Sequence, residues 1–206
     1  MVKYLNDLIK LNLMVKLIGS KKIKTAIFIS GTGSNLKNLI KFSQLKKSPI
    51  KINLIISDNI KAKGLKFAKT FKIRKKTYNF NKQESEMNIL KDLKYNKIDL
   101  ICLAGFMKIL SNNFIKRFNG KILNIHPSLL PKYKGLNTHQ RVIKNKEKYS
   151  GCTVHYVNSK LDAGKIILQK KIKIAKSDTP YSLKKKILKH EHKLYPKAIE
   201  KLYFNL

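Results

Sequence analysis

The chain has 206 residues, of which 43% are hydrophobic, so it is long enough for one domain that buries about 70% of its unfolded surface without a disulfide framework. Its 46 Lys and Arg residues against 11 Asp and Glu give a formal net charge of +35, outside the usual range for a soluble enzyme and suited to a nucleic-acid partner. Two cysteines, and no run of about 20 uncharged apolar residues, favour a reducing, cytoplasmic location over a secreted or membrane-spanning protein.

The first 22 residues mix leucine-rich stretches with charged side chains. Lys3, Asp7 and Lys10 interrupt any apolar core, and no small-residue cleavage site follows, so we do not expect a signal peptide. Residues 1–22 are predicted to be an N-terminal extension, either a short amphipathic helix or an upstream start ahead of Met14. The sequence does not decide between these two interpretations.

From residue 23 onward, short apolar runs alternate with amphipathic segments, a pattern typical of a mostly parallel central sheet flanked by helices. The runs predicted as strands are residues 25–30, 51–56, 98–104 and 121–125. The segments between them with apolar residues at spacings of three and four are predicted as helices 35–45, 62–71 and 84–95. The sequence therefore predicts a single α/β domain over residues 23–206.

The last third of the chain has a different pattern. Residues 152–158 and 166–174 alternate like strands, with a turn at 161–164, and an antiparallel C-terminal addition to the sheet edge fits them. A helix is expected over residues 181–204, kinked or split by Pro196.

A glycine-containing turn follows the first predicted strand, in the sequence Ser-Gly-Thr-Gly-Ser-Asn-Leu of residues 30–36. The N–H groups of a helix start, with the side chains of Ser34 and Asn35, suit a phosphate dianion. Leu36 replaces the third glycine of a dinucleotide fingerprint and no Gly-Lys-Ser/Thr follows, so a single phosphate on a small ligand fits better than NAD or ATP. The alternative is a structural turn with Ser34 as the helix cap.

Asn124 and His126 lie near the carboxyl end of a predicted central strand, where open α/β sheets bind ligands. Residues two apart in a strand point to the same side, so an amide donor and an imidazole would face one pocket. Such a pair can stabilise a developing oxyanion, and the imidazole can also move a proton. The alternative is a structural histidine, although Pro127 and Pro131 indicate a fixed loop after it.

Asp162 is one of only 11 acids and lies in a predicted turn, so it is a candidate for a salt bridge or a specific task. Spacing alone does not connect it to His126. The remaining histidines stand alone or fall on different faces of the last helix, and no metal site is expected from them: His139, His155, His190 and His192.

Taken together, these segments resemble the phosphoribosylglycinamide formyltransferase family of purine synthesis. The matching stretches occur in family order: Ile29–Leu36, Leu103–Ser111, Asn124–Tyr133, Leu161–Gly164 followed by Ile167–Gln169, and Glu191–His192 with Tyr195–Pro196. The resemblance implies a Rossmann-like formyltransferase fold. It also implies transfer of a formyl group from the co-substrate 10-formyltetrahydrofolate to the amine of glycinamide ribonucleotide, without a metal or nucleotide cofactor.

The resemblance also assigns roles to residues of this chain. It implies a catalytic trio of Asn124, His126 and Asp162. For glycinamide ribonucleotide it implies a phosphate site at Gly33, Ser34 and Asn35, and a contact from Glu191 to the glycinamide end. For the folate it implies contacts with Lys82, Met107, Lys108, Ile109, Leu110, Asn158, Ser159, Lys160 and Leu161.

Three positions depart from the family pattern. Lys82 stands where the family usually has Arg, Lys134 replaces a Pro, and Asn137 replaces a His close to the site. Lys82 keeps the charge but loses bidentate geometry toward the folate. Asn137 puts any role of that neighbouring His in doubt.

Two related enzymes share part of this pattern. Methionyl-tRNA formyltransferase has the same Asn-x-His and Ser-Leu-Leu-Pro core, but lacks the Gly-Thr-Gly-Ser-Asn-Leu loop and carries an extra C-terminal domain for which this chain has no room. Formyltetrahydrofolate hydrolase needs an N-terminal regulatory domain, which 22 residues cannot form.

A basic nucleic-acid-binding module is an alternative of another class. Among the 46 basic residues only Arg74, Arg117 and Arg141 are Arg, although recognition of bases and phosphates favours the guanidinium fork. Lys, Ile and Asn have A/T-rich codons, so genome composition alone can produce this charge. We therefore expect small-molecule substrates, no specific nucleic acid, no membrane, and a monomer or homodimer.

Overall fold

The computed structural model describes residues 22–80, 82 and 84–204. A single sheet contains β1 (Ile23–Ile29), β2 (Ile50–Ser57), β3 (Arg74–Thr77), β4 (Leu100–Leu103), β5 (Lys121–His126), β6 (Tyr149–Tyr156) and β7 (Ile166–Lys173). The strand order is β3-β2-β1-β4-β5-β6-β7, parallel from β3 to β5 and antiparallel for β6 and β7. The Rossmann-like fold class predicted from the sequence is confirmed.

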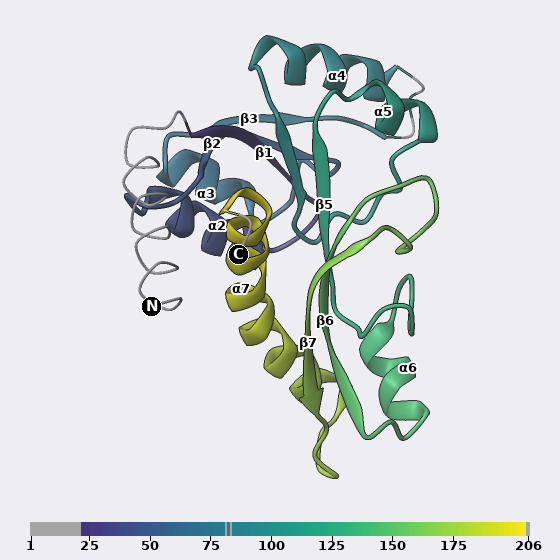
Figure 1. The fold of residues 1–206 in the computed structure, drawn as a ribbon. Coiled ribbons are helices and arrows are strands. Elements are labelled where there is room, and N and C mark those ends of the chain that lie inside the picture. Colours follow the sequence, from purple (N-terminus) through teal and green to yellow (C-terminus); the bar gives the residue numbers. More distant parts are fainter. Residues whose placement is uncertain (1–21, 81, 83, 205–206) are drawn as a thin grey trace, which may run out of the picture.

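The described helices cover both faces of this sheet (Figure 1). They are α2 (Ser34–Gln44), α3 (Leu65–Thr70), α4 (Ser85–Tyr95), α5 (Asn112–Arg117), α6 (Thr138–Lys144) and α7 (Pro180–Phe204). Alternate residues of β1 separate two buried clusters: Ile27 and Ile29 pack with α2, α3 and α7, whereas Ala26 and Phe28 pack with α4 and α5. Strands buried on both faces read as continuous apolar runs, which is why the central strands were predictable.

Three short elements were not predicted. Strand β3 has the sequence Arg-Lys-Lys-Thr and lies at the sheet edge, where charged side chains discourage pairing with other chains but conceal the strand pattern. Helices α5 and α6 have six and seven residues, too few for a clear periodic signal. Apart from Lys22, the predicted extension of residues 1–22 lies outside the described residues.

Helix α7 continues through Pro196 as one helix of 25 residues, so the expected split is wrong. Proline cannot donate the hydrogen bond that the carbonyl four residues earlier would normally accept. That carbonyl belongs to His192, and the side-chain amide of Asn38 on α2 donates to it at 2.6 Å. A partner from another helix therefore satisfies the group that Pro196 leaves free.

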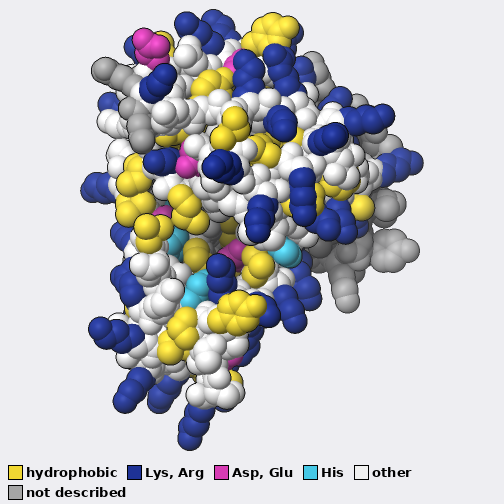
Figure 2. Space-filling model, turned by 180° about the vertical axis from the view of Figure 1, so that it is seen from behind, with side chains coloured by type: hydrophobic (Ala, Val, Ile, Leu, Met, Phe, Trp, Pro, Cys, Tyr) yellow, Lys and Arg dark blue, Asp and Glu magenta, His cyan; other side chains and the backbone are white. Residues whose placement is uncertain are grey.

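The basic side chains lie on the surface. On the face shown in Figure 2, lysine and arginine side chains are spread over the molecule rather than gathered in one patch. None of the helices within the described ranges combines the length and apolar character needed to cross a membrane.

Candidate active site

The candidate active site lies where β5 meets β6 and the turn after β6. Asn124 on β5 is paired directly with His155 on β6 in the antiparallel ladder. The turn between β6 and β7 returns Asp162 to the same place, with its Oδ1 3.4 Å from Asn124 Nδ2 and its Oδ2 3.3 Å from His126 Nδ1. The structure thus brings together the three residues that the sequence could not connect by spacing.

His126 is buried, and both nitrogens of its ring face acceptors. Nδ1 faces the Asp162 carboxylate, and Nε2 lies 2.9 Å from the backbone carbonyl oxygen of Tyr133. Only the doubly protonated, positively charged ring can donate to both partners. The end of β5 thus places an acceptor beside each ring nitrogen of His126.

Asp162 accepts several donors in a position nearly closed to solvent. The backbone N–H of Gly135 donates to its Oδ2 at 2.8 Å, in addition to the contacts with Asn124 and His126. Asp162 has a left-handed backbone with φ of 46°, a conformation that Asp tolerates better than most residues. The turn therefore fixes both the place and the orientation of the carboxylate.

His155 belongs to this cluster, although the sequence analysis treated it as an isolated histidine. Its Nδ1 lies 2.7 Å from the carbonyl oxygen of Tyr156, and its Nε2 lies 3.3 Å from Asn124 Nδ2 and 3.7 Å from Asp162 Oδ1. Burial lowers the pKa of His155, which favours a neutral ring with the proton on Nδ1 and a lone pair on Nε2. Predicting this residue would have required the register of β5 against β6.

The glycine turn joins β1 to α2 as predicted. Gly33 is the N-cap of α2 with φ of 72°, and Ser34 is the first helical residue, so Ser34 is not the cap that the structural alternative required. A Cβ on Gly33 would lie 2.7 Å from the Cα of Gly64, which means that side chains are excluded on steric as well as conformational grounds. The N–H groups of the first turn of α2 remain available for an anion.

A buried hydrogen bond connects this turn to the last helix. Asn35 Nδ2 donates to Glu191 Oε2 at 2.7 Å, a contact that the sequence did not predict. Burial raises the pKa of Glu191. The buried polar atoms that have no hydrogen-bond partner among the described residues include Asn35 Oδ1, His139 Nδ1 and His192 Nε2. Unsatisfied buried groups are uncommon, and a polar ligand would satisfy them.

The raised pKa of Glu191 predicts that the stability of the folded state depends on pH. The folded state holds this proton more tightly than the unfolded state, so the stabilisation present at low pH is lost as pH rises through the folded-state value. Glu191→Gln keeps an acceptor for Asn35 and cannot ionise. We expect its Tm, relative to the wild type, to rise as pH increases from acidic to neutral.

Thermal unfolding at a series of pH values tests this expectation. Glu200→Gln, on the same helix, is the matched control and should follow the wild-type curve. Parallel curves for Glu191→Gln and the wild type would contradict the burial argument.

The residues assigned to the folate occupy three segments of the surface. Lys82, Lys108, Asn158, Ser159 and Lys160 are exposed, as are the large apolar side chains of Met107, Ile109 and Leu161. The rings of Phe80 and Phe106 contact each other edge to face, which places the segment of Lys82 beside that of Met107. Leu110 is only 5% exposed and packs in the core, so its side chain supports this segment instead of facing a ligand.

Figure 2 shows histidine and acidic side chains at the floor of a hollow, with hydrophobic and basic side chains around it. Such a combination of an apolar rim and convergent polar groups is typical of small-molecule sites. Among the described residues, no group of three or more His, Cys, Asp or Glu could hold a metal ion.

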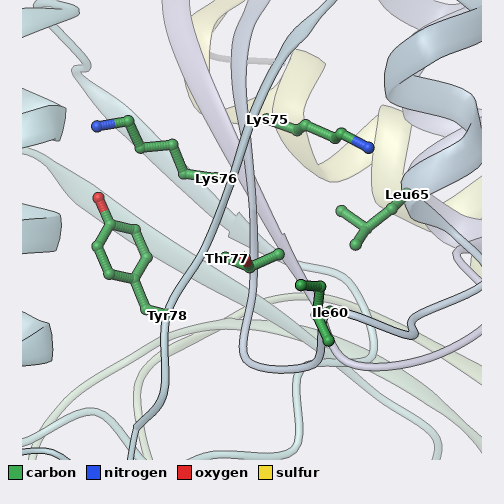
Figure 3. Close-up of a pocket in the computed structure, with 6 residues that line it drawn as sticks. All are labelled: Ile60, Leu65, Lys75, Lys76, Thr77 and Tyr78. Atoms are coloured by element: carbon green, nitrogen blue, oxygen red, sulfur yellow. The ribbon is translucent and has the colours of Figure 1, made fainter.

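Another cavity, of about 510 Å³, lies beside the edge strand β3 (Figure 3). It is lined by Ile60, Leu65, Lys75, Lys76, Thr77 and Tyr78. Lys76 is paired with Asp92 at 2.8 Å, and in Figure 3 it points away from Lys75 and Leu65. Three strands separate β3 from β5, and the lining contains no acid or histidine, so we place the chemistry at the Asp162 cluster.

Comparison with known proteins gives consistent results. A family model described as "Formyl transferase" matches residues 23–199. The phosphoribosylglycinamide formyltransferase of Haemophilus influenzae is 43% identical over 181 residues, which cover 86% of this chain and 85% of that protein. The human trifunctional purine biosynthetic protein adenosine-3 is 41% identical over 184 residues, which cover 87% of this chain but only 18% of that protein.

Solved structures agree with the sequence comparisons. The crystal structure of phosphoribosylglycinamide formyltransferase from Brucella melitensis has a TM-score of 0.84 and 42% identity, covering 88% of this chain and 96% of that one. The corresponding structure from Anaplasma phagocytophilum has a TM-score of 0.82 and 41% identity, covering 88% and 87%.

Proposed function

The chain belongs to the phosphoribosylglycinamide formyltransferase family, and we propose that it transfers a formyl group from 10-formyltetrahydrofolate to the amine of glycinamide ribonucleotide. The observation that carries the proposal is the direct contact of Asp162 with both Asn124 and His126 at the end of β5. We assign catalytic roles to these three residues. His155, at 3.3 Å from Asn124, joins them as a neighbour.

The first task of the site is to bind glycinamide ribonucleotide. We assign its phosphate to Gly33, Ser34 and Asn35, because the start of α2 offers backbone N–H groups and a positive helix dipole. Glu191 is assigned to the glycinamide end, where a carboxylate can accept hydrogen bonds from an amine. The Asn35–Glu191 hydrogen bond supports assigning both residues to one ligand, because it joins the start of α2 to α7.

The second task is to stabilise the transition state of transfer. When 10-formyltetrahydrofolate is bound, it supplies a formyl carbon to which the amine nitrogen bonds as the bond to the folate nitrogen breaks. Asn124 donates an N–H to the formyl oxygen, on which negative charge grows, and the His126 imidazolium provides positive charge beside it. Asp162 keeps His126 charged and assists movement of the proton that the amine loses and the folate nitrogen gains.

The folate is assigned to the three exposed segments around the hollow. Exposed apolar side chains at Met107, Ile109 and Leu161 suit a flat heteroaromatic ring. Lys82 suits the folate carboxylates but offers a point charge instead of a bidentate fork. Leu110 contributes through its buried packing in this proposal.

Release of tetrahydrofolate tests the proposed reaction. We expect it only when both glycinamide ribonucleotide and 10-formyltetrahydrofolate are present with the full chain. Steady release without the amine would indicate a hydrolase, and formylation of methionyl-tRNA in place of glycinamide ribonucleotide would support the tRNA alternative. Absence of all three activities would overturn the proposal.

Ser34→Ala tests the phosphate site. Hydrogen bonds to charged groups contribute about 1.5–3 kcal/mol, so we expect the KM for glycinamide ribonucleotide to rise about tenfold or more while the KM for the folate stays nearly constant. Ser43→Ala is the matched control, because Ser43 lies near the other end of α2 and donates to Ile40 O. Equal changes in both KM values, with folding intact, would count against a phosphate role for this turn.

We also propose that the protein is a cytoplasmic enzyme that acts on small-molecule substrates. The reduced state of Cys102 and Cys152, both free and buried, supports a reducing compartment. The spread of basic side chains over the face in Figure 2 supports weak, nonspecific contact with nucleic acids in place of a dedicated partner. Whether the enzyme is a monomer or a homodimer stays a prediction, as do the extension of residues 1–22 and the single domain that follows it.

A further inference from the structure

The loop between β5 and α6, residues 127–137, supplies two backbone contacts to the candidate active site. The carbonyl of Tyr133 faces His126 Nε2, and the N–H of Gly135 donates to Asp162 Oδ2. Each contact orients one member of the charged pair. The position of this loop therefore contributes to how His126 and Asp162 face each other.

The second half of the loop contains several residues in an uncommon backbone conformation. Tyr133, Gly135 and Asn137 have φ values of 58°, 76° and 56°. Such left-handed residues are uncommon apart from glycine, although Asn adopts this conformation more readily than Tyr. A conformation of this kind persists only when the surrounding structure holds it in place.

Glu147 and Asn145 bond the hydroxyl of Tyr133, and Arg141 on α6 contacts the backbone of the loop around Gly135. Its Nη1 donates to the carbonyl of Lys134 at 2.6 Å and to that of Leu136 at 3.3 Å, the residues on either side of Gly135. Its guanidinium also lies over the ring of Tyr133, 5.4 Å from the centroid. One side chain thus contacts the loop at three residues, Tyr133, Lys134 and Leu136.

A lysine at position 141 could not donate to both carbonyls and stack on the Tyr133 ring at the same time. The planar guanidinium donates in a fixed fork and stacks on a ring at the same time, whereas an ammonium is a point charge on a flexible stem. Arg is rare in this chain, with only three residues among 46 basic ones. One of these three lies on the element that follows the active-site loop.

We propose that Arg141 is a positioning residue for the reaction, which fixes the loop of residues 127–137 so that Tyr133 O and Gly135 N–H hold His126 and Asp162 in register. This inference rests on the proposed function for its kinetic test. Its structural test, the state of the His126 ring, does not depend on any substrate.

Arg141→Lys and Arg141→Ala are the test variants. We expect kcat to fall about tenfold or more with both KM values changed much less, because small misplacement of catalytic groups lowers turnover steeply. Arg74→Lys and Arg117→Lys are matched controls, since Arg74 stacks on Tyr95 and Arg117 contacts Met87, away from the loop. Both controls should keep wild-type turnover.

Two readouts separate positioning from general loss of structure. Guanidinium ion, at concentrations far below those that unfold proteins, should restore part of the turnover of Arg141→Ala and leave the turnover of the two controls unchanged. In NMR spectra, the ring nitrogen signals of His126 should change in both Arg141 variants while most backbone amide signals stay in place.

The outcomes distinguish this inference from the proposed function. If the wild type lacks formyl transfer but the His126 ring signals still respond to Arg141→Lys, the proposed function fails and the positioning role stands. If the wild type is active and the Arg141 variants keep its kcat and its His126 signals, the positioning role is overturned. The positioning role would also be overturned if Arg74→Lys and Arg117→Lys lowered turnover as much as Arg141→Lys does.

Discussion

Replacing Asp162 with Asn should lower kcat by about 100-fold or more, the loss typical of removing one preorganised group from an oxyanion site. The KM values for both substrates should change much less, because Asn keeps the size of Asp and the phosphate turn lies on another element. Turnover measured by release of tetrahydrofolate, over a range of pH values, gives both quantities.

The physical reason is the loss of a negative charge from a site that was built around it. In the wild type, Asp162 accepts from Gly135 N–H and faces donors on Asn124 and His126. Asparagine can still accept one of these bonds, but its amide N–H₂ would face another donor and its neutral group no longer favours a charged ring. Without that support, the positive charge that the reaction needs beside the formyl oxygen is less well stabilised.

A control variant and a double variant show whether the loss is specific to the Asp162–His126 pair. Asp99→Asn, at an exposed position immediately before β4, should keep wild-type turnover. His126→Asn should be about as damaging as Asp162→Asn, and the double variant should lose less than the sum of the two activation free energies. Strictly additive losses would show that the two residues do not act as a pair.

The scaffold was easier to predict from the sequence than the site was. The central strands were found because they are buried on both faces, and residues such as Phe28 and Ile101 stand in continuous apolar runs. The turn at 30–36 was found because glycines mark turns. The Asn124–His126 pair was found because residues two apart in a strand face the same side. Each of these signals is contained within about ten residues, so no tertiary contact was needed to detect it.

The contacts that complete the site depend on pairing between distant segments. His155 enters through the register of an antiparallel pair, and Asp162 through the turn that follows, so their distance in sequence from Asn124 carries no information. Family resemblance supplied Asp162 but not His155. The contact of Asn35 with Glu191 was likewise hidden, because it joins α2 to α7 across 156 positions.

The turn that carries Asp162 is itself held by a close backbone contact at Gly164. A Cβ built on Gly164 would lie 1.7 Å from the carbonyl oxygen of Tyr156 and 2.6 Å from its carbonyl carbon, distances that no real Cβ atom shows. Both of these atoms are backbone in β6, and Tyr156 N donates to Lys165 O at 2.9 Å, so neither side can move freely. Only glycine allows the chain to return this closely to the strand that it has just left.

Gly164→Ala should therefore lower the free energy of unfolding by about 3 kcal/mol or more, as expected for forced overpacking in a rigid place. For a domain of this size that corresponds to a fall in Tm of about 6–12 °C. Gly31→Ala is the matched control, because a Cβ at Gly31 meets nothing within 4 Å. Its stability should stay within about 0.5 kcal/mol of the wild type.

The same substitution should also lower turnover, because relief of the clash must displace the turn and Asp162 lies only two residues earlier. At a temperature where Gly164→Ala is still folded, we expect kcat to fall in the direction of Asp162→Asn while the KM for glycinamide ribonucleotide changes less. Thermal unfolding and steady-state kinetics on the same preparations measure the two effects together. If Gly164→Ala kept both the Tm and the kcat of the wild type, the turn would have another way to place Asp162, and the close approach to Tyr156 would not be what fixes the carboxylate beside His126.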